Sequence, residues 1–186
     1  MAITIKNYEV LDALLMPRSA AGEAPVITTK NEILRVAVQL GDEEMARWAL
    51  ERGAEPNRDY GMLTPLMIAA DCGHSRIVNL LISRGASLNE RTGCEETALI
   101  LACKNAHESS ARPLVEAGAD LNAGELFKGM TALMFAAYHG QTCIVRLLLE
   151  AGADAALKSK DGMTALDFAR TASREDAIDL LLSHGG

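Results

Sequence analysis

The segment GMTALMFAAYHG at residues 129–140, followed by QTCIVRLLLEAGAD at residues 141–154, decides how most of the chain folds. Thr131 stands where the N-cap of a helix belongs, and the apolar run that follows it ends at Gly140. A second apolar run, from Ile144 to Leu149, stops before Gly152, a residue suited to the left-handed conformation that closes a helix. Two short helices are therefore expected back to back, and neither can bury its apolar side alone.

The same unit recurs along the chain. Four Thr residues, each followed two residues later by Leu, mark its start: Thr64, Thr97, Thr131 and Thr164. Their spacings are 33, 34 and 33 residues (97−64, 131−97, 164−131), and a Gly stands 21 residues after each of them. A fifth unit lies upstream, because Gly41 falls 32 residues before Gly73. The chain therefore contains five repeats, which are expected to bury their apolar surface against their neighbours in one elongated domain.

Repeats of about 33 residues that begin with Thr-Pro-Leu and contain two helices resemble the ankyrin repeat. The segments TPLMIAADCGH at residues 64–74 and IVNLLISRGA at residues 77–86 follow that pattern, as do the Asn residues after Gly-Ala at Asn57, Asn89 and Asn122. The resemblance covers residues 30–186. It implies an all-α fold, an ankyrin-repeat solenoid of stacked helix-turn-helix units with β-turn or hairpin fingers.

One departure from the family pattern is systematic. The His that usually follows Thr-Pro-Leu is replaced by Met67, Ile100, Met134 and Asp167. The hydrogen bonds that this His gives between repeats are therefore not expected here, and packing by Met, a flexible side chain that fills gaps, would replace them.

The repeats divide the chain into two parts. Residues 1–29 form an N-terminal segment, with a short helix expected from Tyr8 to Met16 and a linker after Pro17. Residues 30–186 form the repeat domain, with repeats at about 30–58, 59–90, 91–123, 124–156 and 157–186. The N-terminal helix is expected to cap the open face of the first repeat, and a detachable helix that binds a partner is the alternative.

Single residues depart from the repeat pattern in places. Trp48 is expected to fill the core between repeats. In the third repeat, Ala106 replaces Gly, and Pro113 is expected in the first turn of the second helix, which could then be shifted, because a missing N–H costs little there. The fifth repeat is rich in polar residues, as an end unit requires.

Composition and charge narrow the choice of partners. The net charge of −7 disfavours attachment to nucleic acid or to an anionic membrane, and a basic partner surface is expected instead. No apolar run approaches the roughly 20 residues that a membrane span needs, and the first 16 residues lack the basic start of a secretory signal. A monomer in the cytoplasm is expected. A nuclear location, or delivery into a host cell by an intracellular bacterium, is the alternative.

Residues that could carry chemistry are scattered. Cys72, Cys94, Cys103 and Cys143 lack the spacing of a zinc site or a disulfide framework and are interpreted as isolated buried thiols in a reducing compartment. His74 and His107 occupy one structural position of the repeat, and only His139 is a candidate contact. No catalytic residue, cofactor or metal is therefore expected.

The resemblance to ankyrin repeats singles out one surface. It consists of the finger before each Thr and the two residues that follow the Ala-Ala positions of each inner helix. The candidate partner-binding residues are Tyr60, Met62, Leu63, Asp71, Cys72, Glu95, Glu96, Lys104, Asn105, Phe127, Lys128, Met130, Tyr138, His139, Lys160, Asp161 and Met163, with Cys94, Thr171 and Ala172 at equivalent positions. Aromatic residues and Met are enriched in protein interfaces. The alternative is that Phe127 and Met130 pack back onto the neighbouring finger.

The sequence therefore predicts a non-enzymatic scaffold that binds another protein on its concave surface. A stand-alone inhibitor or regulator of one enzyme or transcription factor is the alternative. An enzyme with a site built across repeats is a remote third hypothesis, which would require a convergent cluster of titratable groups in one pocket.

Overall fold

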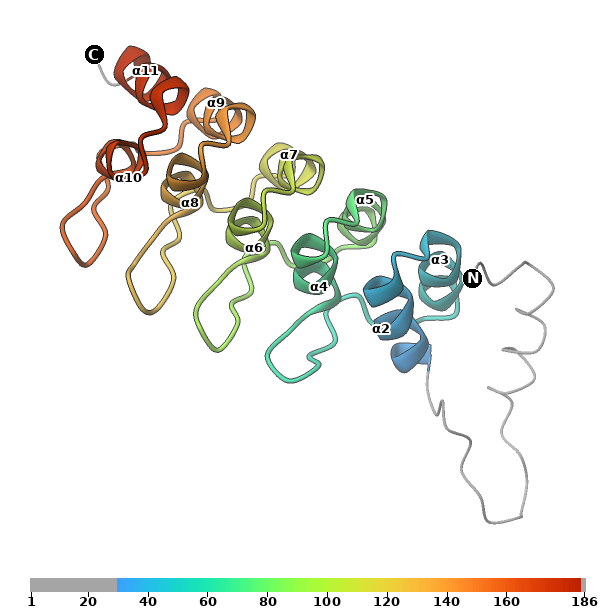
Figure 1. The fold of residues 1–186 in the computed structure, drawn as a ribbon. Helices are drawn as coiled ribbons and strands as arrows, with labels where there is room; N and C mark the ends of the chain where they lie inside the picture. Colours follow the sequence, from blue (N-terminus) through green and yellow to red (C-terminus); the bar gives the residue numbers. More distant parts are fainter. Residues whose placement is uncertain (1–29, 185–186) are drawn as a thin grey trace, which may run out of the picture.

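The computed structural model describes residues 30–184, which form an elongated array of helix pairs (Figure 1). Ten helices lie in this part of the chain. They pair as α2 (Lys30–Leu40) with α3 (Glu43–Glu51), α4 (Pro65–Asp71) with α5 (Ser75–Ser83), α6 (Ala98–Lys104) with α7 (Glu108–Glu116), α8 (Ala132–His139) with α9 (Thr142–Glu150), and α10 (Ala165–Thr171) with α11 (Glu175–His184). The all-α repeat architecture is confirmed, whereas the helix predicted from Tyr8 to Met16 lies outside the described residues.

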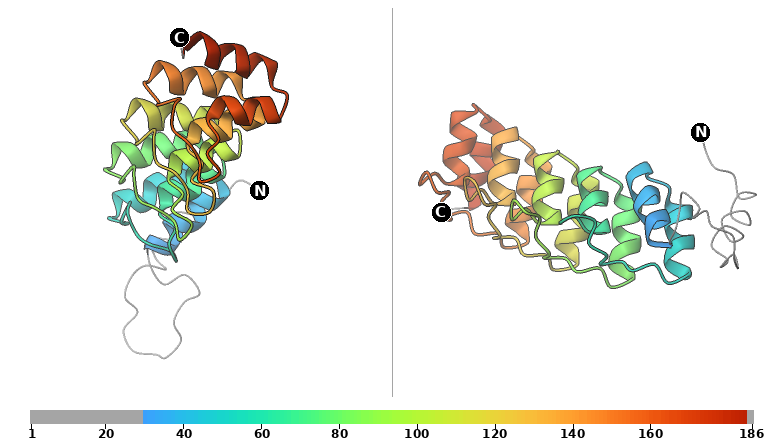
Figure 2. Two further views of the ribbon diagram at one scale, coloured as in Figure 1. Left: turned by 90° about the vertical axis from the view of Figure 1, so that its left-hand side faces the viewer. Right: turned by 90° about the horizontal axis from the view of Figure 1, so that it is seen from below.

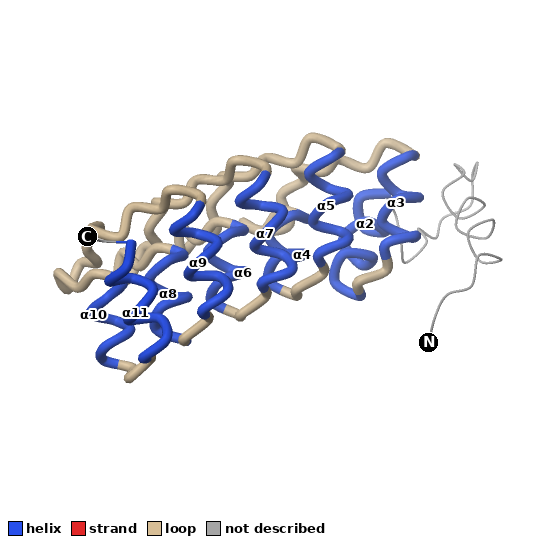
Figure 3. Tube along the Cα trace, turned by 90° about the horizontal axis from the view of Figure 1, so that it is seen from above, coloured by secondary structure: helices blue, strands red, loops and turns tan. Residues whose placement is uncertain are grey.

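The helices stand in two rows. The first helix of each pair belongs to an inner row and the second to an outer row, and the long loops extend from the side of the inner row (Figure 1). Short turns join the two helices of a pair at one edge, and the long loops connect successive pairs at the other (Figure 3). Figure 2 shows the same array from two further sides. Each inner helix packs against the inner helix of the next repeat, so the core runs unbroken along the array.

Each of the last four inner helices begins at its predicted Thr. The Thr hydroxyl accepts a hydrogen bond from the backbone N–H three residues later, as an N-cap does. In two repeats the replaced His is a buried Met whose sulfur accepts the Thr backbone N–H: Met67 Sδ lies 3.4 Å from Thr64 N, and Met134 Sδ lies 3.5 Å from Thr131 N. Met therefore completes the cap as well as filling space.

Small side chains let neighbouring inner helices approach closely. The Ala residues that recur at one position of the inner helices are fully buried: Ala37, Ala69, Ala102, Ala136 and Ala169. Larger apolar side chains fill the space between the two rows, among them Leu81, Leu114 and Leu148, each with no exposed surface. Trp48 is also buried, as predicted. The guanidinium carbon of Arg52 lies 4.2 Å from the centre of its ring.

A ladder of Asn side chains ties each of the first three repeats to the next. The Oδ1 atoms of Asn57, Asn89 and Asn122 each accept a backbone N–H from the following repeat, from Ser87, Asp120 and Asp154 respectively, at 2.7–3.0 Å. Within the first repeat, Asn31 Oδ1 accepts the N–H of Glu55 at 2.8 Å. The next step would fall on Ala156, which has no side-chain acceptor. The Asn positions that carry the family resemblance thus hold the stack together.

Two sequence-based predictions are wrong. Pro113 is the sixth residue of α7, beyond the first turn, because the helix begins at Glu108 in register with α5; no shift of the helix is seen. A proline there leaves the carbonyl of Ser109 without its helical N–H partner. The cysteines are not all buried either. Cys103 is buried, whereas Cys72 and Cys143 are exposed and Cys94 is half-buried.

Candidate functional site

Four loops, which we call fingers, line one side of the array. Each ends at the residue before a helix-capping Thr: finger 1 (residues 59–63), finger 2 (92–96), finger 3 (125–130) and finger 4 (159–163). A backbone hydrogen bond closes the base of fingers 2, 3 and 4, from Thr92 N to Glu96 O, Glu125 N to Met130 O, and Ser159 N to Met163 O. Within the described residues the fingers contain no strand, and one isolated β-bridge joins Gly124 to Thr131.

A polar side chain at the first residue of each finger holds its backbone. Asp59 accepts the N–H of Met62, and Ser159 accepts that of Met163. Thr92 accepts two N–H groups, from residues 94 and 96. Glu125 accepts three, from Phe127 at 2.6 Å, Lys128 at 2.7 Å and Met130 at 3.2 Å. Finger 3 is therefore the most firmly held of the four.

The carboxylate of Glu125 is buried, with 6% of the residue exposed. Burial alone would raise its pKa, but the N–H groups of Met130, Phe127 and Lys128 lower the pKa below its ordinary value, and the Lys160 charge acts in the same direction. Glu125 is thus held as an anion inside finger 3, where it serves the backbone and is not available to a partner.

Finger 3 is one residue longer than the others, which is the origin of the 34-residue spacing between Thr97 and Thr131. The tip of this longer loop exposes two apolar side chains: Phe127 is 71% exposed and Leu126 is 40% exposed. Sequence reasoning named Phe127 but missed Leu126 and Glu125. The irregular spacing of the Thr residues was the signal that marks this finger as different.

Fingers 2, 3 and 4 are joined to one another by their backbones. Leu126 N donates to Cys94 O at 2.8 Å, and Lys160 N donates to Lys128 O at 2.8 Å. The Lys160 ammonium also donates to the carbonyl of Leu126. These three fingers therefore form one connected ledge, with the apolar tip of finger 3 at its centre.

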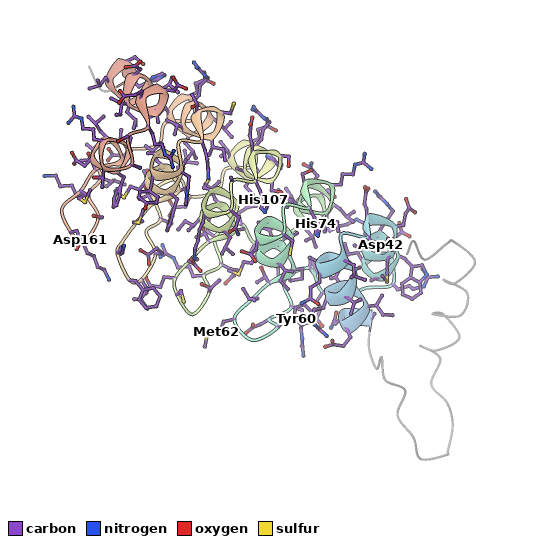
Figure 4. All side chains as sticks on the ribbon, viewed as in Figure 1. Asp42, Tyr60, Met62, His74, His107 and Asp161 are labelled. Carbon is purple, nitrogen blue, oxygen red and sulfur yellow. The ribbon has the colours of Figure 1, made fainter. Side chains whose placement is uncertain are left out.

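Finger 1 stands apart from this ledge. No backbone hydrogen bond joins it to finger 2 among residues 30–184. A cleft of about 270 Å³ lies between the two, lined by Asn57, Asp59, Met62, Thr64, Met67, Glu90, Arg91, Thr92 and Gly93. Met62 is 63% exposed and has a left-handed backbone with φ of 69°, a conformation that residues other than Gly rarely adopt. Tyr60 and Met62 are labelled in Figure 4.

Tyr60 points into its own chain. Its hydroxyl donates to the backbone carbonyl of Asn31 in the first repeat, 2.5 Å away, and its ring packs against the core. Burial, with a smaller contribution from Glu32, raises the pKa of Tyr60 to about 12. The prediction that Tyr60 faces a partner therefore needs correction, because its polar end is already used to hold finger 1 against the first repeat.

In the second and third repeats, most polar side chains on the helical part of the candidate surface form hydrogen bonds or ion pairs with other residues of this chain. Asn105 donates to the carboxylate of Asp71 at 2.8 Å, and a ring nitrogen of His107 lies 3.1 Å from the Asp71 carbonyl oxygen. Lys104 pairs with Glu96 at 2.7 Å, and this hydrogen bond raises the pKa of the lysine. These polar groups support the repeat contacts.

Farther along, two exposed side chains end the inner helix of the fourth repeat. Tyr138 is 43% exposed, and its ring makes an edge contact with Phe168 of the next repeat at a centroid distance of 6.5 Å. The exposed His139 ring lies 5.2 Å from the Tyr138 ring. Tyr138 is therefore partly a packing residue as well as a candidate contact residue.

The predicted site residues divide by exposure. The exposed ones are Met62, Leu63, Asp71, Cys72, Glu95, Lys104, Asn105, Phe127, Lys128, Tyr138, His139, Lys160 and Asp161. Tyr60, Cys94, Glu96 and Met163 are half-buried. Met130 is 6% exposed and belongs to the hydrophobic core, so its prediction as a contact residue is wrong. Figure 4 shows Asp161 on finger 4, at the other end of the finger row from Met62.

The described residues were also searched for a metal site and for a membrane-spanning helix. No group of three or more His, Cys, Asp or Glu side chains in residues 30–184 is placed to hold a metal ion. In the same residues, no helix is both long and apolar enough to cross a lipid bilayer.

Comparison with known proteins agrees with this geometry. The family model for ankyrin repeats in three copies matches residues 1–92, 34–125 and 99–186. The chain belongs to the ankyrin-repeat family. Repeats of this family form a protein–protein interaction module, and the family is generally non-enzymatic.

Several curated proteins are similar to this chain. An ankyrin repeat protein of fowlpox virus (strain NVSL) is 33% identical over 166 residues, which cover 83% of this chain and 48% of the relative. An E3 ubiquitin-protein ligase of Arabidopsis thaliana is 38% identical over 89 residues, 48% of this chain and 17% of the relative. An ankyrin repeat and SAM domain-containing protein of Mus musculus is 43% identical over 81 residues, 44% of this chain and 9% of the relative. The chain thus spans less than half the length of each.

Proposed function

We propose that this chain is a scaffold that binds a partner protein on the ledge formed by fingers 2, 3 and 4, with Phe127 as the central anchor. The observation that carries the proposal is the exposure of Phe127, 71%, on a finger whose backbone is fixed by three hydrogen bonds to Glu125. A rigid aromatic side chain loses little conformational freedom when it binds, which is why aromatic residues dominate interface hot spots.

The neighbouring side chains support the same surface. Leu126 extends the apolar tip, and Tyr138 and His139 expose aromatic edges on the inner helix of the same repeat. The core does not depend on the Phe127 side chain, because most of that side chain is exposed. Exposed apolar groups with no structural role are typical of interaction sites.

The role of the whole protein is part of this proposal. The stand-alone inhibitor or regulator remains the second hypothesis, and the ligase activity in the name of one relative belongs to a protein of which this chain matches 17%. The basic partner surface expected from the net charge remains a prediction. On finger 2, the carboxylates of Glu95 and Glu96 are already paired with Arg91 and Lys104.

The test combines Phe127→Ala with Tyr138→Ala. Binding to the natural partner, recovered by co-purification from the native source and measured by calorimetry, is expected to weaken by more than about 2 kcal/mol, the scale of an interface hot spot. The far-ultraviolet circular dichroism should not change. Because Tyr138 contacts Phe168, the unfolding free energy of the variant is measured in parallel.

The matched control is Arg146→Ala with Glu150→Ala. Both residues are exposed on the outer helix α9 of the same repeat, and their replacement should leave the affinity unchanged. An unchanged affinity of the Phe127 and Tyr138 variant would contradict the proposal and would make residues 1–29 the next segment to test.

A further inference from the structure

The first three repeats and the last two differ in their ion pairs. Seven ion pairs join described residues, and all of them lie between residues 32 and 112: Arg35–Glu32, Arg47–Glu43, Arg58–Glu55, Arg84–Glu51, Arg91–Glu95, Lys104–Glu96 and Arg112–Glu108. Within residues 113–184 there is no ion pair. The charges of the last two repeats interact only over longer distances, as Lys160 does with Glu125 and Lys158 with Asp167, and they are less completely neutralised than those of the first three repeats.

The exposed charges beside the apolar tip are mostly positive. Lys128 on finger 3, Lys160 on finger 4 and Lys158 directly before finger 4 are all exposed. Two carboxylates lie on the same two fingers. That of Glu125 is buried and bonded to three N–H groups, and that of Asp161 is exposed. Three exposed cations and one exposed carboxylate thus lie on fingers 3 and 4 or directly before finger 4, on a chain whose net charge is −7. The Asp167 carboxylate acts on Lys158, but it already accepts two hydrogen bonds from Thr164.

We infer that fingers 3 and 4 bind an acidic segment of a partner protein, one that places an apolar side chain on Leu126 and Phe127 and carboxylates beside Lys128 and Lys158. The inference rests on the proposed function and names the class of partner. A local basic patch on an acidic protein attracts acidic segments while the rest of the surface repels them, so the patch also sets where and in which orientation they dock.

Nucleic acid is the other polyanion that a basic, aromatic patch attracts. The remaining charges argue against it, because Asp161 lies among the lysines and the whole chain is strongly acidic. Binding to nucleic acid depends on many phosphate contacts, each of which needs a cation. Three lysines beside an aspartate are too few for such a polyanion, but they suit a short acidic peptide.

A peptide selection tests the inference and does not require the natural partner to be identified. A phage library of random dodecapeptides is selected on the full chain at physiological salt. Enriched peptides are expected to combine Asp or Glu with a neighbouring Phe, Leu, Ile or Trp. The best peptide is then synthesised with a fluorophore, and its affinity is measured by anisotropy. The affinity should fall as the salt concentration rises, because the charges are exposed.

Charge reversal locates the site. Lys128→Glu with Lys158→Glu should weaken peptide binding by about tenfold or more, since each change turns an attraction into a repulsion. Lys160 is left in place because it donates to the carbonyl of Leu126 and helps to hold finger 3. The control is Arg76→Glu with Arg146→Glu, which changes the net charge equally on the exposed side of outer helices α5 and α9 and should alter the affinity less than about twofold.

Each other outcome overturns the inference. Enrichment of basic or uncharged peptides whose binding requires Phe127 would refute the acidic partner and leave the proposed function standing. Peptides insensitive to both Phe127→Ala and the lysine reversals would count against both. Failure to enrich any peptide, or tighter binding of a single-stranded oligonucleotide than of the selected peptide, would also reject an acidic protein segment as the ligand.

Discussion

Finger 1 and finger 3 carry an aromatic residue at the same distance before the capping Thr, yet they use it in opposite ways. Tyr60 lies four residues before Thr64 and turns inward to bond the carbonyl of Asn31. Phe127 lies four residues before Thr131 and projects outward, 71% exposed. Finger 3 is one residue longer than finger 1, and Phe127 lacks the hydroxyl with which Tyr60 reaches an internal acceptor. Equivalent positions in a repeat therefore need not share a function.

The largest loss of stability is expected in the core that all repeats share. Leu148→Ala removes a side chain with no exposed surface and should lower the free energy of unfolding by about 2–5 kcal/mol, measured by urea denaturation. Leu182→Ala on α11, where the side chain is 51% exposed, is the control and should cost far less. A loss of unfolding free energy below about 1 kcal/mol for Leu148→Ala would contradict the packing of the outer row, on which both fingers depend.

Finger 3 should depend on its buried carboxylate more than finger 1 does on its exposed one. Glu125→Ala leaves three backbone N–H groups without their acceptor and is expected to cost about 1–3 kcal/mol in urea unfolding. Asp59→Ala removes one acceptor, from the N–H of Met62 in an exposed loop, and should cost less. Equal costs for the two variants would show that finger 3 is no more firmly held than finger 1.

Substitution of the inward-facing Tyr60 should lower the free energy of unfolding more than substitution of the outward-facing Phe127. Tyr60→Phe deletes the hydrogen bond to Asn31 while keeping the ring, and a loss of about 1 kcal/mol is expected. Phe127→Ala should change the unfolding free energy by no more than about 0.5 kcal/mol, because the side chain is largely in solvent already. The reverse ranking in thermal or urea unfolding would mean that Phe127 serves the fold and not a partner.

The smallest expected effect is the pH dependence that Glu125 gives to finger 3. Its pKa is lower in the folded protein than the ordinary value near 4.5, so its stabilising contribution is complete above that value and is lost as the pH falls through the lower folded pKa. The difference in unfolding free energy between the wild type and Glu125→Gln should therefore shrink as the solution is acidified below the ordinary carboxyl pKa. A difference that stays constant on this acidification would show that the charge of Glu125 does not hold the finger.

Much of the fold followed from local patterns. The five repeats, the capping role of Thr64, Thr97, Thr131 and Thr164, and the turn at Gly152 depend on short-range periodicity and on residues with strong conformational preferences. The family resemblance supplied the finger surface. The resemblance placed Met130 wrongly, because the side of a loop on which a side chain lies depends on the length of the loop and on its closing hydrogen bonds. The prediction for Pro113 was also wrong, because the position of this residue in α7 is fixed by the register of α7 with α5.

By itself, then, the sequence determined the number of repeats, the order of the helices and the region where a partner is expected, since each repeat specifies its own helix pair through contacts within about 33 residues. Only the tertiary structure decided which aromatic serves the fold and which faces solvent. It also decided that Arg84 of the second repeat pairs with Glu51 of the first, whereas the lysines of fingers 3 and 4 form no ion pair with a carboxylate of the described residues. The physical reason is that hydrogen bonds and ion pairs between repeats depend on which groups the stacking brings within reach, and residues about 30 or more positions apart in the chain carry no local sign of that proximity.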